Sequence, residues 1–597
     1  MVDYKIVCIF VTDFKRVNIM YRRSNKSSQL NLFSSAQSFL PVKARKIFED
    51  DQKWHNQFRV HITQRIDEDL FRPLFCEDFG APNTSIRVLV GMMVLKEAQG
   101  WSDSQLFEQC LFNILVRSAL GLMNIDDPLP VPSTYYLLRK RIVERETCGN
   151  ENLIEKVFSQ ITKSQAIDLQ VNGKKIRMDS KLMGSNIAWY SRYELIHETL
   201  RQACLSCQSQ IDPLLSGSDI SLLKSIVGES GDKVSYRSNS AEIETKLSRL
   251  GSVIHAIISQ IDDDSSNPVK TLRRVFSEQY KIEKGKIIVR PRQEISAGSI
   301  QSPHDTDCDY RQKDDQKVKG YSINVTETCD TGDTLNLLID VSVDTAGAAD
   351  CDFLQPAIAV AQEVVTDKIE TVNADGAYHS PENQDYCREN GIDLTLGAIQ
   401  GRPSRYDFSA DEAGNPVVTD LETNMTVPVR KVEPRKEGVG PKWAILNDRN
   451  QYRYFSQKDI DTCSLRKQIV TRTSEELNVR NNVEASIFQL GFHYPNAKSR
   501  YRGLIKHKML ASLRCLWINL IRIVNFAAGS SPNCAQKSTK RRIYPGFNPQ
   551  IVKTGRILHR LCRFFTNMEG LISILFWHLK IFTLFNSRWL ELAILKK

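Results

Sequence analysis

The feature that most constrains the fold of this chain is an alternation of strand-type and helix-type segments in its middle. Runs rich in Val, Ile and Thr predict strands, and apolar residues at helical spacing predict helices. The alternation predicts a mixed sheet with helices packed on it. In chain order the predicted elements are strands 318–328 and 334–343, helix 353–365, strand 369–374, helix 381–390 and strand 393–399.

One more strand precedes these elements, and the whole α/β region is placed at residues 165–527. Residues 174–180 direct Ile176 and Met178 toward one side, as a half-buried strand does. The region is too long for one simple sheet, so we expect insertions. The remaining segments are a polar, mostly helical insertion at about 181–300, a β-rich insertion at about 400–470 with many Gly and Pro residues, and helices at 474–490 and 501–526.

The chain before the sheet predicts a compact helical domain at residues 46–150, after an irregular segment at 1–45. One helix is expected to end at Gly100, and a capping box that begins at Ser102 starts the next one. The last helix follows a proline-rich connector, and Ser133 is predicted to cap it. This helix is basic, which suits contacts to DNA phosphates. The residues expected to contact DNA here are Arg139, Lys140 and Arg141.

Charge and cysteine usage limit the class of protein. The net charge of +10 over 597 residues permits a polyanionic partner without requiring one. The 14 cysteines lack the spacing of a disulfide framework, which favours a reducing compartment. The N-terminal sequence lacks the features of a signal peptide, and the apolar stretch 571–585 is shorter than the about 20 residues of a membrane span. We therefore expect a cytoplasmic protein outside the membrane.

Several smaller patterns carry less weight. Cys204 and Cys207 form half of a zinc site, but no second pair follows at a usable spacing. The Gly-rich phosphate loop of ATP-driven motors is absent from the sequence. His304 and Asp305 fit either a turn with an Asp side-chain hydrogen bond or a loop that contacts DNA beside the active site.

Three acidic residues are distinguished by their positions. Asp179 and Asp375 each end a predicted strand, where open α/β sheets bind ligands, and Glu484 lies on a predicted helix. Mg²⁺ prefers carboxylate oxygens, and two such ions can activate a hydroxyl and neutralise the leaving oxygen of a phosphodiester. Each acid taken alone is more often a turn, a helix cap or a surface residue. The separations, 375 − 179 = 196 and 484 − 375 = 109 residues, mean that only the fold can bring the three together.

Long stretches in both regions carry a family resemblance. They are TSIRVLVGMMVLKEAQGWSDSQLFEQCLFNILVRSALGL (84–122), PSTYYLLRKRI (132–142), IRMDSKLMGSN (176–186), SPHDTDCDYRQKDDQKVKGYSINVTETCD (302–330), VNADGAYHS (372–380), RNNVEASIFQLGFHY (480–494) and SRYRGLIKHKMLASLRCLWINLIRI (499–523). In this order they resemble the bacterial insertion-sequence transposases that join an InsH-type helical domain to a DDE catalytic core. The resemblance covers about residues 45–527.

The resemblance implies a ribonuclease-H-like fold for the α/β domain, whose element order is the one predicted above. It implies that Asp179, Asp375 and Glu484 are the catalytic residues and hold two Mg²⁺ or Mn²⁺ ions. Arg480 matches the family's Arg-x-x-x-Glu spacing and is expected to bind DNA. The implied activity is cleavage at the ends of an insertion sequence and joining of the 3′-hydroxyls to target DNA. The implied setting is double-stranded DNA in the bacterial nucleoid, bound by a homodimer or higher oligomer.

The region of the third acid departs from the full family signature. Relatives with that signature have a Tyr three residues before Arg480 and a Lys seven residues after Glu484, where this chain has Leu477 and Gly491. Glu476 is the alternative third acid. The lysines that could replace the missing DNA contact are Lys498, Lys506 and Lys508.

A basic run with an aromatic residue, at 499–508, follows the helix of Glu484. Such a run suits phosphate contacts and base stacking, although a solvated helix face has the same composition. The residues expected to contact DNA in this run are Arg500, Tyr501, Arg502, Lys506 and Lys508.

Two other functions stay open at this point. One is a catalytically inactive DNA-binding relic, which Leu477, Gly491 and the apolar tail favour. The other is a metal-dependent nuclease of the same fold, which cuts DNA without rejoining it. The tail and its polar linker, at residues 531–597, lie beyond the resemblance, and we expect them outside the catalytic machinery.

Overall fold

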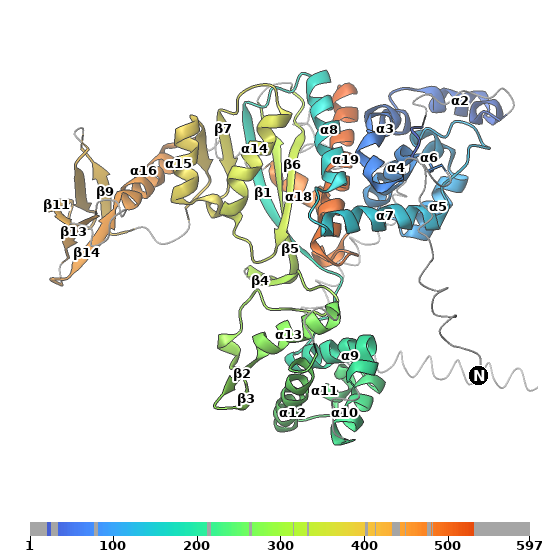
Figure 1. The fold of residues 1–597 in the computed structure, drawn as a ribbon. Coiled ribbons are helices and arrows are strands. Elements are labelled where there is room, and N and C mark those ends of the chain that lie inside the picture. The colour runs from blue at the N-terminus through green and yellow to red at the C-terminus, as the bar shows by residue number, and fades with distance from the viewer. Residues whose placement is uncertain are drawn as a thin grey trace, which may run out of the picture. The chain divides into compact units, whose positions relative to one another are not determined.

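A region of helices precedes a mixed sheet in the chain, as Figure 1 shows for this computed structural model. The chain divides into two units, Met1–Ser530 and Ser531–Lys597, and all described residues belong to the first. The predicted tail therefore lies outside the described residues. The structure describes residues 21–24, 34–76, 82–211, 217–261, 266–313, 316–330, 334–399, 404–411, 414–432, 442–447, 449–473, 479 and 482–529.

The central sheet confirms the predicted strands and their order along the chain. Strand β1 pairs with β5 on one side and with β7 on the other, β5 also pairs with β4 and β6, and β7 pairs with β8. The pairs β1–β7 and β7–β8 are parallel, whereas β5 is antiparallel to its neighbours. The strands are β1 (Lys175–Gly184), β4 (Asp309–Lys313), β5 (Gln316–Thr328), β6 (Leu338–Thr345), β7 (Thr371–Ala374) and β8 (Asp393–Leu396).

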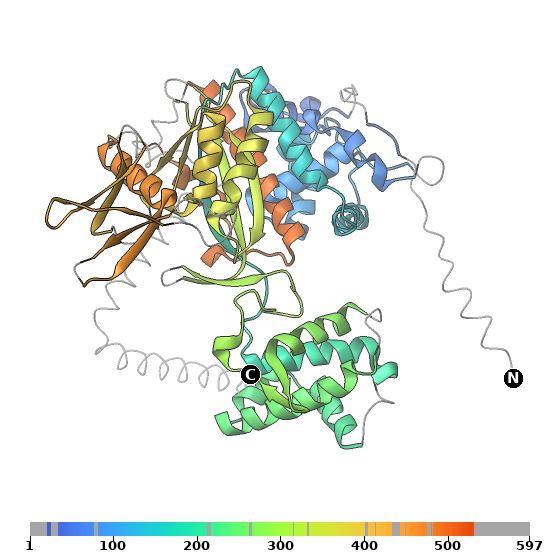
Figure 2. The same ribbon diagram turned by 60° about the vertical axis from the view of Figure 1, so that its left-hand side comes forward.

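The two faces of β1 pack against different cores. Ile176 and Met178 belong to a core with helix α14 (Leu354–Val364), which connects β6 to β7. Helix α15 (Pro381–Asn390) connects β7 to β8, and Figure 2 shows both helices beside the sheet. Met183, whose side chain leaves the opposite face of β1, belongs to a second core with helix α19 (Leu504–Ala527).

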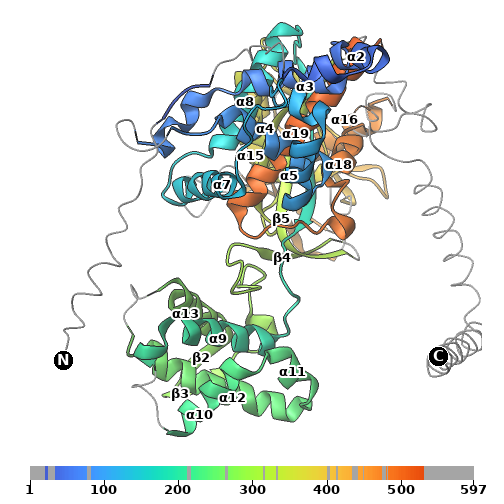
Figure 3. The same cartoon turned by 90° about the vertical axis from the view of Figure 1, so that its right-hand side faces the viewer.

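The N-terminal helices share this second core with the end of the described chain. Helix α4 (Ile86–Gln99) is buried from Ile86 to Ala98, so other parts of the protein cover it on every side. It packs against α19, as Figure 3 shows, and the same core joins Phe58 and Trp517. The helical domain predicted at 46–150 therefore does not close a core of its own. The other long helices of this region are α2 (Val42–Glu49), α3 (Trp54–His61), α5 (Asp103–Phe112), α6 (Ile114–Ala119), α7 (Pro132–Thr147) and α8 (Leu153–Asp168).

Local signals at the helix ends are confirmed with one correction. Gly100 ends α4 with a φ of 66°, and Ser102 and Gln105 form the predicted capping box of α5. Ser133 does not cap α7, because that helix begins one residue earlier, at Pro132. Proline suits the first helical position, where it has no intrahelical N–H to lose.

The first insertion is a helical unit with its own core. Strand β1 continues to Gly184, so the insertion starts later than residue 181, and its first helix begins at Arg192. Leu250, Ile254 and Phe276 are among the residues that fill its core. The elements are α9 (Arg192–Ile211), α10 (Gly217–Gly228), α11 (Gly231–Tyr236), α12 (Ser240–Ile258), α13 (Asn267–Gln279), β2 (Tyr280–Glu283) and β3 (Lys286–Val289).

The second insertion contains two small antiparallel sheets of three strands each. A small core that includes Phe408 and Phe455 joins the two sheets. The β-rich segment ends earlier than residue 470, because helix α16 (Gln457–Thr471) follows the last strand. The strands are β9 (Tyr406–Ala410), β10 (Pro416–Asp420), β11 (Met425–Val427), β12 (Arg430–Val432), β13 (Lys442–Leu446) and β14 (Tyr452–Ser456).

Helix α19 is the one helix of the described residues that is long and apolar enough to span a membrane. Its most apolar 18-residue window is 72% buried. That burial is typical of the central helix of a folded core, and α19 packs against α4, α8 and β6.

Candidate functional site

The register of the parallel pair β1–β7 brings two of the predicted acids together. Arg177 on β1 lies opposite Asn373 on β7, an offset of 373 − 177 = 196 residues. The same offset, continued two residues past this last pair, relates Asp179 to Asp375, which directly follows β7. Asp179 does not end its strand as predicted, because β1 continues to Gly184. Neighbouring strands are about 4.8 Å apart, and residues in one row of a parallel pair point to the same face. Asp179 and Asp375 are therefore neighbours just beyond the paired part of β1 and β7, and both carboxylates are close enough to Tyr378 to raise its pKa.

The backbone shapes the turn after Asp375. A Cβ atom on Gly376 would lie 1.9 Å from the carbonyl oxygen of Ala398, so only glycine fits at this position. The Gly376 amide donates a hydrogen bond of 2.7 Å to Oδ1 of Asp375. On β1 the Ser180 amide donates in the same way, at 2.8 Å, to Oδ1 of Asp179. Each carboxylate is thus oriented by the amide of the next residue.

A buried tyrosine and a third aspartate adjoin this pair. Burial, together with the charges of Asp179, Asp350 and Asp375, raises the pKa of Tyr378, so its phenol stays protonated. The Tyr378 hydroxyl donates to Oδ1 of Asn324 at 2.7 Å. Asp350 is buried and accepts a hydrogen bond of 3.0 Å from the Ser180 hydroxyl. Sequence analysis missed Asp350, because an acid just before a helix normally reads as a cap.

Glu484 lies on the helix that covers the face of β1 with Asp179. The helix is α18 (Val483–Gly491), and Glu484 is exposed in its first turn. The Nζ of Lys181 donates a hydrogen bond of 3.1 Å to the carbonyl oxygen of Ile487. This contact places α18 over the face of β1 that carries the odd-numbered side chains. Nevertheless, the described residues contain no group of three acids, cysteines or histidines arranged to hold a metal ion. The structure thus brings Asp179 and Asp375 together and does not gather Glu484 with them.

Of the other residues of the family signature around Glu484, only Gly491 lies within the described residues. Arg480, Glu476 and Leu477 lie outside the described residues. At Gly491, a Cβ atom would lie 2.4 Å from Nζ of Lys181. The Lys181 ammonium group thus occupies the space into which a side chain at residue 491 would extend.

A buried charge cluster anchors α18 to the sheet. Glu327 on β5 is completely buried between Arg177, at 2.5 Å, and Arg522 of α19, also at 2.5 Å. Burial opposes ionisation of Glu327, but the two guanidinium groups outweigh it and lower its pKa. The Ser486 hydroxyl of α18 donates to Glu327 at 2.6 Å, and Arg177 donates to the carbonyl oxygen of Val479 at 2.9 Å. This cluster positions the segment with Glu484, and no sequence signal identified it.

The predicted DNA-binding residues of α7 differ in their surroundings. The Arg139 guanidinium lies 5.5 Å from the ring centre of Tyr135 and 5.7 Å from that of Tyr501. Lys140 is exposed and lies 3.5 Å from Glu144. Arg141 is turned inward, where it donates to the carbonyl oxygen of Leu74 at 3.1 Å.

The basic run after α18 lies beside α4 and α7. The Tyr501 hydroxyl contacts Glu97 and accepts a hydrogen bond of 3.1 Å from Lys96, both on α4. Arg500 and Arg502 are exposed and donate to backbone carbonyl oxygens of Trp101, at 2.9 Å, and Asn186, at 2.7 Å.

Two of the three predicted lysines have fixed partners, and the third lines a cavity. Lys508 forms an ion pair of 3.2 Å with Glu146, and Lys498 donates to the carbonyl oxygen of Ile187 at 2.9 Å. Lys506 is exposed at the start of α19. With Lys96, Arg139, Arg500 and Arg502 it lines a basic cavity of about 480 Å³.

The first helical region matches a known family. Residues 46–141 match a family model described as a transposase domain (DUF772). This part of the chain is therefore similar to that transposase domain. The match covers α4 and most of α7, and it ends before Asp179 and the sheet. No curated protein and no solved structure matches the chain.

The loop at His304 and Asp305 connects the basic run at residues 499–508 to the sheet. Asp305 is buried and accepts hydrogen bonds from the Tyr321 hydroxyl at 2.6 Å and the Gly503 amide at 2.9 Å. Its other partner is the Ser185 hydroxyl at the end of β1. His304 lies 3.2 Å from Glu198 of the helical insertion. Asp305 thus acts as a bridge between β1, β5 and the start of α19.

Proposed function

We propose that this protein is a DNA transposase that cuts the ends of a mobile element and joins the freed 3′-hydroxyls to target DNA. The chemistry would be metal-dependent phosphoryl transfer on double-stranded DNA, with Asp179, Asp375 and Glu484 as the catalytic acids. The match of residues 46–141 to a transposase-domain model supports this proposal, and it is independent of the acids because it ends before the sheet begins.

The observation that carries the proposal is the common row of Asp179 and Asp375. It occurs in a sheet where β6, β5, β1, β7 and β8 lie in that order and β5 is antiparallel to its neighbours. This arrangement supports a ribonuclease-H-like assignment for the α/β domain. Two unrelated acids 196 residues apart would not be expected at matching positions just beyond the last paired residues of two adjacent strands, and the carboxyl end of a strand such as β7 is where open sheets bind ligands.

The donor set fits Mg²⁺ or Mn²⁺. Mg²⁺ is usually held by one or two carboxylates and keeps several waters for exchange with substrate phosphates. Asp179 and Asp375 supply oxygen donors from adjacent strands, and Glu484 on the first turn of α18 would supply the third. When bound, a pair of such ions activates the attacking hydroxyl and stabilises the charge on the leaving oxygen.

The protein's own residues would organise this site. The amides of Ser180 and Gly376 orient the two aspartates, and the Glu327 cluster fixes α18 above them. Tyr378 keeps its proton on Oη and donates it to Asn324, so it adds no negative charge beside the acids. DNA phosphates would approach over the exposed cations at 500–506.

The test uses the full chain and a plasmid in which the DNA from both sides of the coding region flanks a marker. Asp179→Asn and Asp375→Asn should each lower cleavage by several orders of magnitude, because metal stabilisation of the reacting phosphate is lost. Retention of the parent's melting temperature and DNA affinity would locate the defect in the chemistry. Asp344→Asn, at an exposed acid of β6, is the matched control and should cleave normally.

The third acid and the reaction class need separate readouts. Glu484→Gln should lose cleavage like the aspartate variants, whereas normal cleavage would transfer the role to Glu476. Supplied with pre-cut ends, the parent should join them to target DNA. Cleavage without joining would instead identify a nuclease, and binding without either reaction an inactive relic.

A further inference from the structure

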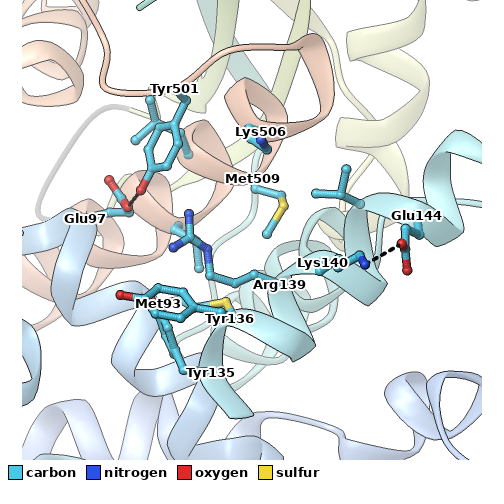
Figure 4. A pocket seen from close by; sticks show the side chains of 13 residues that line it. Met93, Glu97, Tyr135, Tyr136, Arg139, Lys140, Glu144, Tyr501, Lys506 and Met509 are labelled. Atoms are coloured by element: carbon cyan, nitrogen blue, oxygen red, sulfur yellow. Dashed lines mark hydrogen bonds and ion pairs between the residues drawn. The ribbon is translucent and has the colours of Figure 1, made fainter. Parts of the chain in front are cut away.

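Two adjoining cavities lie where α7, α4 and the residues around Tyr501 meet. One has a volume of about 450 Å³ and is shown in Figure 4, and the other is the basic cavity of about 480 Å³. Arg139, Tyr501 and Lys506 line both of them, so the cavities share a wall. Each volume lies in the range of small-molecule sites, about 300–1,000 Å³.

The first cavity is lined mainly by apolar and aromatic side chains, with the charged groups of Glu97, Lys140 and Glu144 also among its lining residues. Tyr135 is fully buried, and Tyr136 is 46% exposed at the wall of the cavity. Their rings meet edge to face, with centres 5.8 Å apart. The aliphatic part of the lining is made by Met93, Val143, Met509, Leu510 and Leu513.

The wall between the cavities is held rigidly in place. The Arg139 guanidinium lies between the rings of Tyr135 and Tyr501, and the Tyr501 hydroxyl is tied to α4 by Glu97 and Lys96. Figure 4 shows Arg139 directed toward the side of the cavity with Tyr501 and Glu97. A preformed wall of this kind lowers the entropic cost of binding a ligand against it.

The second cavity is suited to an anion. Arg500, Arg502 and Lys506 are exposed around it, and Asp103 is the acid among the residues that line it. Lys96 already neutralises Asp103 in an ion pair of 2.6 Å. The cavity therefore has an excess of positive charge, which attracts phosphate.

We propose that the two cavities together bind one unstacked nucleotide of the DNA substrate. The base would enter the aromatic cavity and its phosphate would contact Arg500, Arg502 and Lys506. A ligand with a flat apolar part next to an anion matches both cavities at once, whereas an apolar peptide would leave the basic one unsatisfied. The inference rests on the proposed function, because DNA is the source of the nucleotide.

The position of the site relative to the acids suits a contact within the same DNA end. Asn186 lines the basic cavity and lies seven residues after Asp179 in the chain, two residues beyond the end of β1. At about 3.3 Å per residue, the separation is at most about 23 Å. This corresponds to about seven nucleotides of one strand at 3.4 Å each. The unstacked nucleotide would thus lie within one helical turn of the cleaved phosphodiester.

The test compares the binding of the full chain to three duplexes of one sequence. One is fully paired, one carries a single bulged thymidine, and one carries the same bulge without its base. The bulged thymidine should bind about tenfold more tightly than either other duplex, since base stacking on an aromatic side chain strengthens binding by this order. A bulge removes the cost of extracting a base from the helix, which makes the cavity's contribution visible.

Variants at exposed positions of α7 locate the effect. Tyr136→Ala should abolish the preference for the bulged thymidine, and Tyr136→Phe, which keeps the ring, should retain it. Leu137→Ala is the matched control, because Leu137 is exposed on the same helix and does not line the cavity. Joint replacement of Arg500 and Arg502 by Ala should weaken all three duplexes and reduce the salt dependence of binding.

Several results would overturn the proposal. Equal affinity for the paired and bulged duplexes would exclude an unstacked base, and equal affinity for the two bulges would show recognition of bent DNA alone. Retention of the preference by Tyr136→Ala would place the base elsewhere. Competition by free thymidine monophosphate at the affinity of the bulged duplex would identify a free-nucleotide site. Failure to bind any duplex would overturn the proposed function and this inference together.

Discussion

The N-terminal region and the insertion both consist mainly of helices, but their cores differ. The core of the N-terminal region is shared with distant parts of the chain, whereas the insertion has a core of its own. In the N-terminal region, α4 is buried all round, and its core continues into α19, more than 400 residues later in the chain. In the insertion, α12 and α13 bury one face each, and the core closes among residues of the insertion itself. Both regions were expected to be helical from the same periodicity.

The difference shows that helical periodicity predicts an element and not its independence. A helix that is apolar on every side needs partners on every side, and the chain must supply them from elsewhere. An amphipathic helix needs only one apolar partner surface, which its neighbours in sequence can provide. The region at residues 46–141 that matches the transposase-domain model is therefore integrated with the sheet, whereas the insertion has the organisation of an attached unit.

The largest expected effect comes from removing each region whole. A variant that begins at residue 151 should lose its cooperative melt, because Trp517 and the rest of the α4-facing side of α19 become exposed. A variant in which a flexible linker of about ten residues replaces residues 190–300 should keep a cooperative melt of the sheet. Calorimetry checks both. A cooperative melt in the first variant would contradict the shared core.

Replacement of single aromatic residues tests the same comparison with a smaller expected loss of stability. Trp517 in α19 contacts Trp54, and Tyr280 in the insertion stacks on Phe276 at 5.2 Å. Trp517→Ala and Tyr280→Ala should each cost about 3–5 kcal/mol. Hydrogen exchange should show faster opening across the sheet and N-terminal helices for Trp517→Ala, and only within residues 190–300 for Tyr280→Ala. Spread of the Tyr280→Ala effect into β1 and β7 would show that the insertion is not a separate unit.

The smallest effect concerns the seam between α8 and β6. Burial raises the pKa of Asp340 to about 7 and that of Glu155 to about 7. The folded state therefore binds protons at these two carboxyl groups more tightly than the unfolded chain does. Their contribution to the free energy of unfolding is complete below about pH 4 and is lost as pH rises through about 7.

The corresponding variant is Asp340→Asn. It should flatten the pH dependence of the unfolding free energy between about pH 4 and 7 by about 2 kcal/mol, within the about 4 kcal/mol limit of a three-unit shift. Urea denaturation at several pH values measures this. Asp232→Asn, at an exposed acid of the insertion whose pKa a Ser230 hydrogen bond lowers, is the control and should leave the slope over this range unchanged.

Much of the fold was predictable because short-range signals govern it. Helix α15 begins at Pro381 after the cap residue Ser380 and ends at Gly391, whose φ of 69° favours glycine. The strands β5, β7 and β8 were predicted from alternating or continuous apolar runs. The boundaries of the insertions were less accurate, since β1 extends to Gly184 and α16 replaces the end of the β-rich segment.

The candidate site was predictable only in part. Asp375 follows its strand as predicted, but Asp179 lies in the middle of β1, and the proximity of the two acids depends on the register of β1 against β7. The Glu327 cluster had no sequence signal, because its three charged members come from β1, β5 and α19. The burial of these three charged side chains together results from tertiary packing, so no local sequence pattern predicts it.

The sequence by itself determined the order of the strands and helices, the caps of α5 and α15, and the position of Asp375 directly after a strand. Those features depend on neighbouring residues, whose side chains and backbone preferences act within a few positions. Only the tertiary structure decided that α4 and α19 share a core, and that Arg139 of α7 lies between Tyr135 and Tyr501. The contacts of α4 with α19 and of Arg139 with Tyr501 join segments hundreds of residues apart. They form because apolar surfaces and charges must find partners wherever the folded chain presents them.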